Sequence, residues 1–468
     1  MNHAMKKLLQ FALGPISGAI ISFVTVPLIT YFLLPEEIGR AGMFTMVQAL
    51  MPTICLGLDQ AYTREFYVED DKKNLLLNSM LLPFSLAVLV FIIFTINSAF
   101  FSRILFDQDN YNLVVILIGF SAITTVLQRF ILLKIRMEEK ALEYSIFTFA
   151  LKIIIFLLTF IFIIFIRTDF LSIVYAKIIG QMVICCVLVF RYVDSSDISM
   201  FKVNKKLKKK LLFFGMPLVI SVLVENLLKS SSTIALRYFS DFEELGLFSI
   251  GNQVTNLLMV IQASFMLIWK PIAYRWHEEK RKMKDYQLVS EIVLAVMSFV
   301  FLALLFLRPV IAIFISGQFD EAQYLLGFLS FYPIMFTLMT TTKLGIRFSR
   351  KNYLSVIAAI ASLLVNLLLN ILFIPNLGAL GAAIAIGVSY VFYFILLTFL
   401  SFSVWEGFSI KKHLCIISLM LAIAVVDVLY PNQIIYVKIG CLILFLIIHK
   451  RIFHIIIKYG FNFKKANL

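Results

Sequence analysis

The sequence is short of charge. Only 15% of its 468 residues are Asp, Glu, Lys or Arg, whereas 61% are hydrophobic, and the mean hydropathy is +0.95. A soluble protein of this length could not keep so much apolar surface from water. A bilayer accommodates it, because each helical span needs roughly 20 consecutive apolar residues. The hydrophilic gaps between apolar runs are too short for a soluble domain, so the composition predicts an all-α polytopic membrane protein.

Motifs that carry enzymatic chemistry are missing as well. The five cysteines all fall inside apolar runs, without metal-ligand spacing and without a place in an outer loop where a disulfide would form. The five histidines lie near expected cytoplasmic helix ends and form no metal cluster. No P-loop is present, so transport powered by ATP bound to this chain is not expected. We therefore predict neither an enzyme nor a metal or soluble cofactor.

Acidic residues are scarcer than basic ones, 27 against 42, and the net charge is +15. Such a balance could indicate nucleic-acid binding. However, the basic residues lie in short clusters between apolar runs, as in the cytoplasmic loops of membrane proteins. No zinc-finger spacing or aromatic–basic sheet motif accompanies them. We interpret the charge as a topology signal and as attraction to anionic lipid, and we expect no nucleic-acid partner.

Apolar runs predict about fourteen transmembrane helices. The first run follows a basic N-terminus and is too long for the core of a signal peptide, so we expect it to be retained. The fourteen predicted spans are 11–34, 41–60, 75–101, 111–133, 142–166, 171–193, 211–236, 245–268, 287–316, 322–346, 353–374, 377–400, 413–430 and 433–449.

The distribution of Lys and Arg predicts the orientation of these spans, because cytoplasmic loops carry the excess. With the N-terminus inside and the loops assigned alternately, 33 basic residues fall in inside segments. The outside segments hold only Arg40, Arg103, Arg167, Arg237 and Arg308. We therefore predict a multi-pass membrane protein with both termini in the cytoplasm.

A short internal repeat divides the chain. Residues 31–39 align with residues 238–246 without a gap, and five of nine positions are identical. Both copies fall in the loop between the first and second span of their half. Since six spans precede the basic stretch 194–210, both halves enter the membrane in the same direction, as in transporters built from parallel repeats.

The repeat predicts two parallel six-helix bundles, followed by two additional C-terminal helices. The predicted parts are an N-terminal six-helix bundle (1–193), a basic cytoplasmic linker (194–210), a C-terminal six-helix bundle (211–400), and two further helices with a cytoplasmic tail (401–468).

Several segments carry a likeness to a known family. In chain order they are Leu34–Gly39, Leu56–Ala61, Arg64–Phe66, Glu244–Ile250, Trp269–Pro271 and Ile374–Ala385. The last contains a Pro-x-x-Gly-x-x-Gly-Ala-Ala turn. In their order and spacing across the first twelve spans, they resemble the multidrug/oligosaccharidyl-lipid/polysaccharide exporter superfamily, and within it the O-antigen (Wzx-type) flippases.

This resemblance implies a MATE-like fold, in which two six-helix bundles face each other across a central cavity and carry substrate by alternating access. The implied substrate is an undecaprenyl-pyrophosphate-linked oligosaccharide repeat unit. It would be moved from the cytoplasmic to the periplasmic leaflet of the bacterial inner membrane, for O-antigen or a similar surface polysaccharide, as part of lipopolysaccharide biosynthesis. A polysaccharide polymerase and a chain-length regulator are candidate partners besides the lipid bilayer.

Four lysines lie within or at the edge of predicted spans, where a charge usually faces a cavity or a partner. Lys438 is near the start of its span, and we expect it to snorkel to the interface. Lys152 and Lys177 have no acidic residue within helical reach on their own helices. They are candidates for a cationic cavity wall that binds pyrophosphate, with a structural pair or snorkelling as the alternative.

The fourth lysine, Lys229, follows Glu225 by four residues, so the two share one helical face. Either they neutralise each other, or Glu225 takes a coupling H+ or Na+ while Lys229 binds the anion. Asn366 and Asn370 have the same spacing and are candidates either to line the cavity or to bond a neighbouring helix, the commoner role.

Charges at the ends of spans have a second set of interpretations. Arg40 and Arg237 flank the repeated outer loop and could guide an anionic head group, unless the nearby glutamates neutralise them. Asp59 and Arg64 lie at the cytoplasmic mouth, where we expect a local salt bridge rather than contact with substrate.

Other functions remain open on the sequence alone. A cation-coupled multidrug exporter of the same fold is the nearest rival, although it would be expected to use acidic cavity residues. A lipid II-type flippase would share the fourteen spans. A membrane polysaccharide polymerase or glycosyltransferase needs a sizeable extracytoplasmic loop, and the longest outer loops here, near 102–110 and 317–321, are too short for one.

Overall fold

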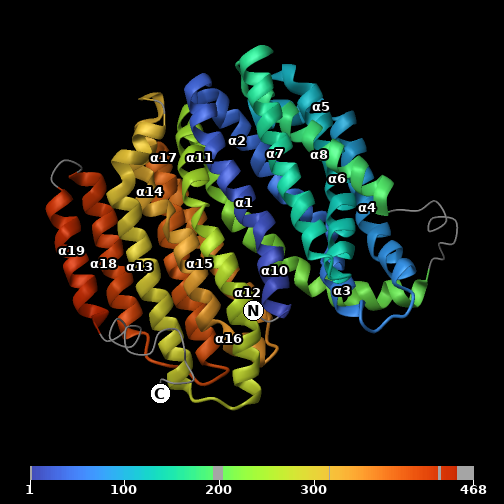
Figure 1. Ribbon diagram of the computed structural model, residues 1–468. Helices are drawn as coiled ribbons and strands as arrows, with labels where there is room; N and C mark the ends of the chain where they lie inside the picture. Colours follow the sequence, from blue (N-terminus) through green and yellow to red (C-terminus); the bar gives the residue numbers. More distant parts are fainter. Residues whose placement is uncertain (1–2, 193–203, 316, 431–433, 451–468) are drawn as a thin grey trace. The chain divides into compact units, whose positions relative to one another are not determined.

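The computed structural model in Figure 1 describes residues 3–192, 204–315, 317–430 and 434–450. Helices are the only regular elements in this part of the chain. Residues 194–203 of the predicted linker and the tail beyond residue 450 lie outside the described residues.

The helices form two compact units, one up to Ser249 and the other from Ile250. In the first unit the elements are α1 (His3–Phe32), α2 (Pro35–Leu50), η1 (Met51–Cys55), α3 (Leu58–Glu65), α4 (Lys72–Ile96), α5 (Ser98–Phe106), η2 (Asp109–Tyr111), α6 (Asn112–Met137), α7 (Ala141–Phe165), α8 (Phe170–Tyr192) and α10 (Lys205–Phe239). Helix α11 (Phe242–Thr255) crosses the boundary.

The second unit continues with α12 (Leu258–Glu278), α13 (Met283–Phe314), η3 (Gly317–Phe319), α14 (Ala322–Leu329), α15 (Phe331–Thr342), α16 (Leu344–Phe348), α17 (Tyr353–Phe402), α18 (Lys411–Leu429) and α19 (Ile434–Ile448). This division reflects packing, whereas the plan with boundaries at 194–210 and 400 reflects the repeat. That domain plan stays a prediction.

The prediction of an all-α membrane protein is confirmed. Within the described residues, nine helices are long and apolar enough to cross a membrane, or ten if the bent pair Pro35–Cys55 and Leu58–Glu65 is one span. Each of the fourteen predicted runs overlaps a helix. Two predicted spans are joined in α17, where Gly378 has φ 50° and ψ −128° and breaks the helix after Pro375. This conformation is accessible to glycine and disfavoured for residues with a Cβ.

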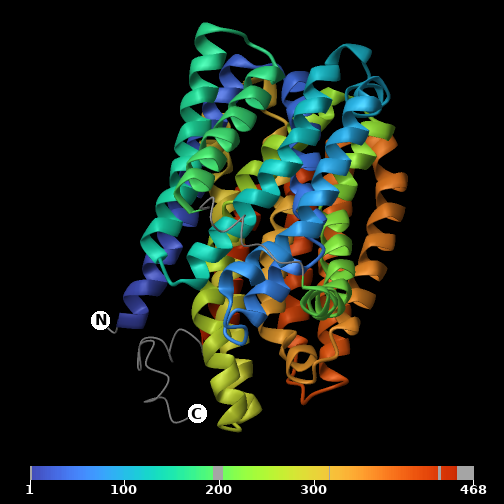
Figure 2. The same cartoon turned by 90° about the vertical axis from the view of Figure 1, so that its right-hand side faces the viewer.

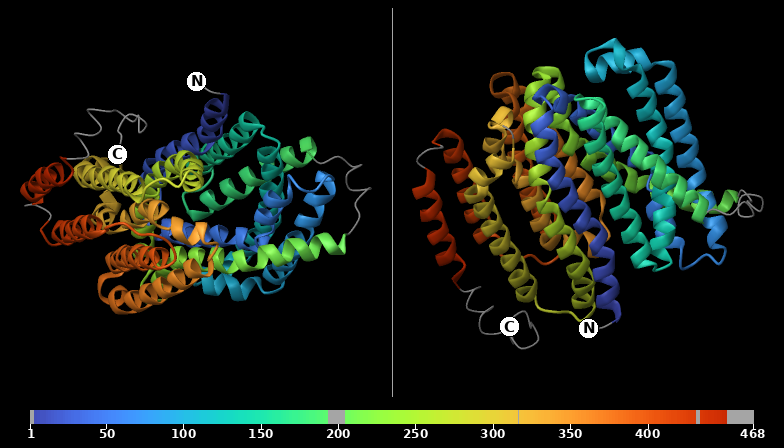
Figure 3. Two further views of the ribbon diagram at one scale, coloured as in Figure 1. Left: turned by 90° about the horizontal axis from the view of Figure 1, so that it is seen from below. Right: turned by 45° about the horizontal axis from the view of Figure 1, so that its top comes forward.

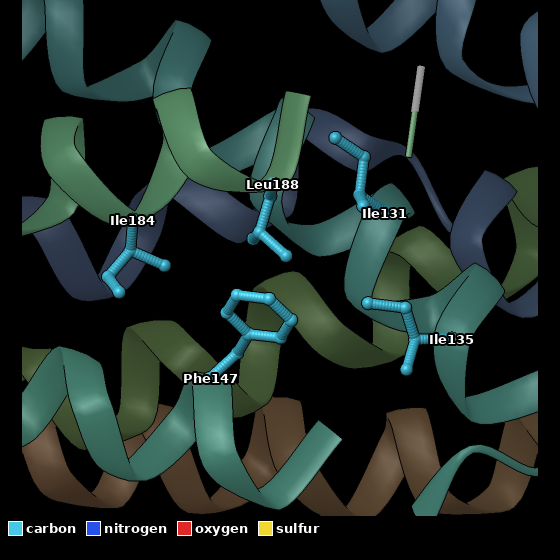
Figure 4. Packing of buried hydrophobic residues seen from close by; sticks show 5 residues of the cluster. All are labelled: Ile131, Ile135, Phe147, Ile184 and Leu188. Atoms are coloured by element: carbon cyan, nitrogen blue, oxygen red, sulfur yellow. The ribbon is translucent and has the colours of Figure 1, made fainter. Parts of the chain in front are cut away.

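The core of the first unit shows why helices α6, α7 and α8 stay together. Figure 4 shows Ile131 and Ile135 of α6, Phe147 of α7, and Ile184 and Leu188 of α8 in one buried cluster. The residues on α6 and α8 are four apart, so each pair lies on one helical face. Helix α1 runs beside α7 in the same unit (Figure 2). This packing positions the two membrane-level lysines of α7 and α8.

The repeated segments pack against each other within the first unit. A Cβ on Gly39 of α2 would overlap the carbonyl oxygen of Phe242, and a Cβ on Gly246 of α11 would overlap that of Pro35. In the repeat alignment, Gly39 corresponds to Gly246 and Pro35 to Phe242. The two contacts are therefore equivalent, and each requires the absence of a side chain.

Candidate substrate-binding site

Lys177 of α8 points toward α2. Its Nζ donates a hydrogen bond to Oγ1 of Thr45 at 2.5 Å and lies 5.7 Å from the centre of the Phe44 ring. None of the ion pairs in the part of the chain that the structure describes includes this lysine. Thr45 and Phe44 were missed from the sequence, because nothing in α2 marks which polar residue faces α8.

Lys152 lies at the middle of α7 and faces α1. A Cβ on Gly18 of α1 would be 3.0 Å from Cγ of Lys152, so the glycine leaves room for the lysine stem. The residue is exposed at the surface of the unit, and its charge acts on that of Lys177. It too takes part in no ion pair among the residues described here. Helices α1, α2, α7 and α8 thus bring two positive charges together within one unit.

Amide side chains hold α8 one turn beyond Lys177. Gln181 donates from Nε2 to Oγ1 of Thr125 on α6 at 2.8 Å, and Gln128 of α6 donates to the carbonyl of Gln181 at 3.0 Å. Polar residues inside apolar spans are the signal by which sequence reasoning could have found these contacts. They fix the rotation of α8 and hence the direction of Lys177.

Arg40 is neutralised by its neighbours, as the second of its two interpretations predicted. Its Nη1 and Nη2 lie 2.6 Å and 2.5 Å from carboxylate oxygens of Glu37 and Glu36. Arg237 instead pairs with Asp107 at 3.1 Å, a partner that is distant in sequence. Both guanidinium groups also lie over the ring of Phe242, at 5.2 and 5.1 Å. Their contact with an anionic head group stays a prediction.

The remaining polar candidates lie on other helices. Glu225 and Lys229 are half-buried on α10, and each makes a polar or electrostatic interaction. Asn366 and Asn370 of α17 are completely buried, and Nδ2 of Asn370 donates to Oδ1 of Asn366 at 2.8 Å. Their roles in ion coupling and in lining a cavity stay predictions.

The expected salt bridge of Asp59 is present, but with a different partner. Oδ2 of Asp59 accepts hydrogen bonds from Nη2 and Nε of Arg129 on α6, at 2.6 and 2.8 Å. Arg64 instead lies 3.9 Å from Glu65. Nζ of Lys210 pairs with Glu65 at 2.6 Å and donates to Glu69 at 3.0 Å, and these two carboxylates raise the pKa of Lys210.

The expectation that Lys438 snorkels is wrong. Its side chain is buried, and Nζ donates to the carbonyl of Leu305 at 2.8 Å and lies 3.2 Å from Asp427. Arg308, which was assigned to an outer loop, is buried in α13 and pairs with the same aspartate at 2.7 Å. Because Arg308 and Lys438 both pair with Asp427, burying these charges costs less free energy than burying an isolated charge would. Asp427 is the acid that the sequence reasoning overlooked.

Two histidines are also buried in the second unit. His413 of α18 lies 2.9 Å from the hydroxyl of Ser290, and His449, just after α19, lies 3.3 Å from that of Ser298. No group of His, Cys, Asp and Glu that could hold a metal ion occurs in residues 3–192, 204–315, 317–430 and 434–450.

Comparison with known proteins identifies the family and the fold. The family model described as "Polysaccharide biosynthesis protein" matches residues 4–277, more than half of the chain. A search of curated proteins found no match.

Solved membrane transporters share the fold. The structure of the lipid II flippase MurJ in an inward closed conformation has a TM-score of 0.70 at 16% identity, over 95% of this chain and 99% of that one. An inward-facing multidrug resistance MATE family transporter of the MOP superfamily has a TM-score of 0.62 at 15% identity, over 86% and 97%. A MOP superfamily transporter from Pyrococcus furiosus has a TM-score of 0.53 at 15% identity, over 86% and 95%.

The likeness to these structures confirms the expected MATE-like fold, and the family match covers both the lysines of α7 and α8 and the reciprocal glycines. The chain therefore belongs to the polysaccharide biosynthesis protein family, with the fold of the MOP superfamily transporters.

Proposed function

We propose that this protein is a flippase for an undecaprenyl-pyrophosphate-linked oligosaccharide repeat unit. It moves the unit from the cytoplasmic to the periplasmic leaflet by alternating access, for O-antigen or a similar surface polysaccharide. The observation that carries the proposal is the pair Lys152 and Lys177, two close positive charges at membrane depth that take part in no ion pair among the described residues.

A pyrophosphate fits these charges. A lysine in a membrane span costs roughly 2.5–3.5 kcal/mol on insertion scales, so two without an acidic partner need a reason. The ammonium groups repel each other, and an anion between them would relieve that repulsion. Lysine binds phosphate as a point charge with three donors. The hydroxyl of Thr45 holds Lys177 in place, since it accepts a hydrogen bond from the lysine ammonium.

The family and the fold support the same class of substrate. Membership in the polysaccharide biosynthesis family favours a glycan cargo, and one neighbour in structure is a lipid II flippase. A lipid II-type substrate therefore remains the nearest alternative. The MATE neighbours favour a second candidate, a cation-coupled multidrug exporter. The two cationic side chains argue against it, because they would repel a cationic drug.

The setting follows from the charge distribution of the loops. We place the protein in the inner membrane with both termini in the cytoplasm, since that orientation puts most of the basic residues inside. A polysaccharide polymerase and a chain-length regulator would act on the product. Glu225 is our candidate for the group that takes a coupling H+ or Na+.

The test begins with a deletion strain, in which the lipids and the surface polysaccharide are analysed. Single lipid-linked units that accumulate in the cytoplasmic leaflet of spheroplasts, with surface polymer lost, support the flippase. Accumulation in the periplasmic leaflet would mean a polymerase instead. Normal lipids with lost drug tolerance would mean the exporter.

The lysines are then tested by complementation of that strain. We expect the double variant Lys152→Gln, Lys177→Gln to insert normally and fail to restore the polymer. The matched control is Lys140→Gln, which removes an exposed lysine that pairs with Glu138 at 2.8 Å before α7. A surface pair of this kind contributes little. Full complementation by the double variant would refute the site.

A further inference from the structure

Three helices of the second unit meet at a group of buried charges. Helices α18 and α19 lie along α13 (Figures 1 and 3). Where they meet, Asp427 of α18 receives Nη1 of Arg308 from α13 on one carboxylate oxygen and faces Nζ of Lys438 from α19 with the other, at 2.7 and 3.2 Å. We call Arg308, Asp427 and Lys438 the buried triad. Their exposed fractions are 7%, 1% and 4%.

The buried triad has one positive charge too many. Two cations share a single carboxylate, and in the part of the chain that the structure describes the charged groups that act on Lys438 are Asp427 and Arg308. On the neighbouring helix α14, the centre of the Tyr324 ring lies 4.7 Å from the guanidinium carbon of Arg308, and this contact adds no negative charge. Nε of Arg308 and Oδ1 of Asp427 have no hydrogen-bond partner among the described residues. The group is therefore neither neutral nor fully satisfied, which is costly inside a membrane protein.

The loss of one proton would remove the surplus charge, and of the three residues in the buried triad only Lys438 can release it. Arginine does not lose its proton in proteins. Protonation of Asp427 would increase the positive charge rather than reduce it. Deprotonation of Lys438 makes the triad neutral, and the remaining amine hydrogens can still bond the carbonyl of Leu305.

We propose that Lys438 is a proton-binding site whose occupancy is linked to the packing of α19 on α13. In the packed state the burial of Lys438 away from water favours the neutral amine. When Lys438 binds a proton, the surplus charge favours a state in which the start of α19 separates from α13 and the ammonium reaches water. Lys438 is the fifth residue of α19, so a small displacement exposes it. This inference does not depend on the substrate proposed above.

The packing of α19 can be measured directly in the full-length protein in lipid nanodiscs. The native cysteines are replaced, and spin labels are attached at Val310→Cys of α13 and Tyr436→Cys of α19, two exposed positions close to Arg308 and Lys438 in sequence. Electron paramagnetic resonance then gives the separation of the helices as a function of pH. Since one proton is bound, the packing equilibrium should shift by up to about tenfold per pH unit toward separation as the pH falls.

Variants show whether Lys438 is the group that titrates, because His413 of α18 and His449, just after α19, also contact α13. Lys438→Met, which is always neutral, should stay packed at every pH. Lys438→Arg, which is always charged, should resemble the wild type at low pH. The matched control is Lys412→Met, since Lys412 forms a balanced pair with Glu291 between α18 and α13, at 3.1 Å, and should titrate like the wild type.

Two results would overturn the proposal. The first is a wild-type separation that does not change with pH. The second is a Lys438→Met protein that titrates like the wild type, which would assign the proton to another group. If Lys438→Arg does not fold, the pH titrations of the wild type and of Lys438→Met are still enough to test the proposal.

Discussion

Gly39 and Gly246 occupy equivalent positions in the two copies of the internal repeat, and each lies against the residue that opens the other's helix. Gly39 of α2 meets the carbonyl of Phe242, and Gly246 of α11 meets the carbonyl of Pro35. The repeat visible in the sequence is thus also a contact in space, in which the two copies pack reciprocally within the first unit.

This reciprocity predicts that either glycine is sensitive to a single methyl group. Gly39→Ala and Gly246→Ala should each lower the free energy of unfolding by about 1–3 kcal/mol, because the new Cβ must push a backbone carbonyl away. Thermal unfolding in detergent measures the effect. Gly440→Ala is the control, since nothing lies within 4 Å of a Cβ there and alanine favours a helix. Equal melting temperatures for all three variants would contradict the packing.

The hydroxyl that holds Lys177 should matter for transport. Thr45→Val keeps the shape and removes the acceptor of the hydrogen bond from Nζ. Hydrogen bonds to charged groups contribute about 1.5–3 kcal/mol, so we expect export to fall by roughly tenfold or more. Accumulation of lipid-linked units in the deletion strain measures it.

The control for this variant is Thr95→Val on α4, where the hydroxyl bonds only the carbonyl of Phe91 of its own helix. Complementation by Thr45→Val at the level of this control would show that the orientation of Lys177 is not required.

The salt bridge between Asp59 and Arg129 should couple α3 to α6. Asp59→Asn, Arg129→Gln and the double variant form a cycle, and we expect a coupling free energy of about 1 kcal/mol, because the carboxylate is buried while the guanidinium is partly exposed. Chemical unfolding of the purified protein measures it. A matched cycle on Arg281 and Glu279, an exposed pair at 3.2 Å, should give a smaller value. Equal values would mean that burial of Asp59 adds nothing.

The contribution of Lys210 to the stability of the protein should depend on pH and on salt concentration. Its pKa is raised by Glu65 and Glu69, so its contribution to stability is complete below the ordinary lysine pKa and is lost as the pH rises through the higher value of the folded state. The difference between the wild type and Lys210→Met should therefore be constant around neutral pH and decrease in alkaline solution. It should also decrease at high salt, because the pair is partly exposed. A difference that grows with salt would contradict this.

Much of the fold follows from local patterns. Each predicted span overlaps at least one helix because the bilayer selects long apolar runs, and the sequence Pro375–Gly378 marks the kink in α17. Lys152 and Lys177 could be recognised as candidates because both lie inside long apolar spans, and a charge inside the membrane is costly.

The partners of the charges could not be predicted in the same way. Arg129 is 70 residues from Asp59, and Arg308 is 119 residues from Asp427. Such pairs are created when helices pack, and helical periodicity carries no information on which faces meet. Lys438 was expected to reach the interface for this reason: its position in the helix was known, whereas its neighbours on α13 and α18 were not.

The carboxylate of Glu37 joins two helices as well as neutralising Arg40. Its second oxygen accepts a hydrogen bond from the backbone N–H of Phe170 at 2.7 Å, at the first residue of α8. Helices α2 and α8 are thus fastened at this end by Glu37 and further along by Thr45 and Lys177. With two fixed points, neither sliding nor rotation of one helix against the other is free. A motion of the first unit would carry Lys177 and the Thr45 hydroxyl as one rigid piece, so a phosphate bound to Lys177, as proposed above, would keep the same geometry throughout that motion.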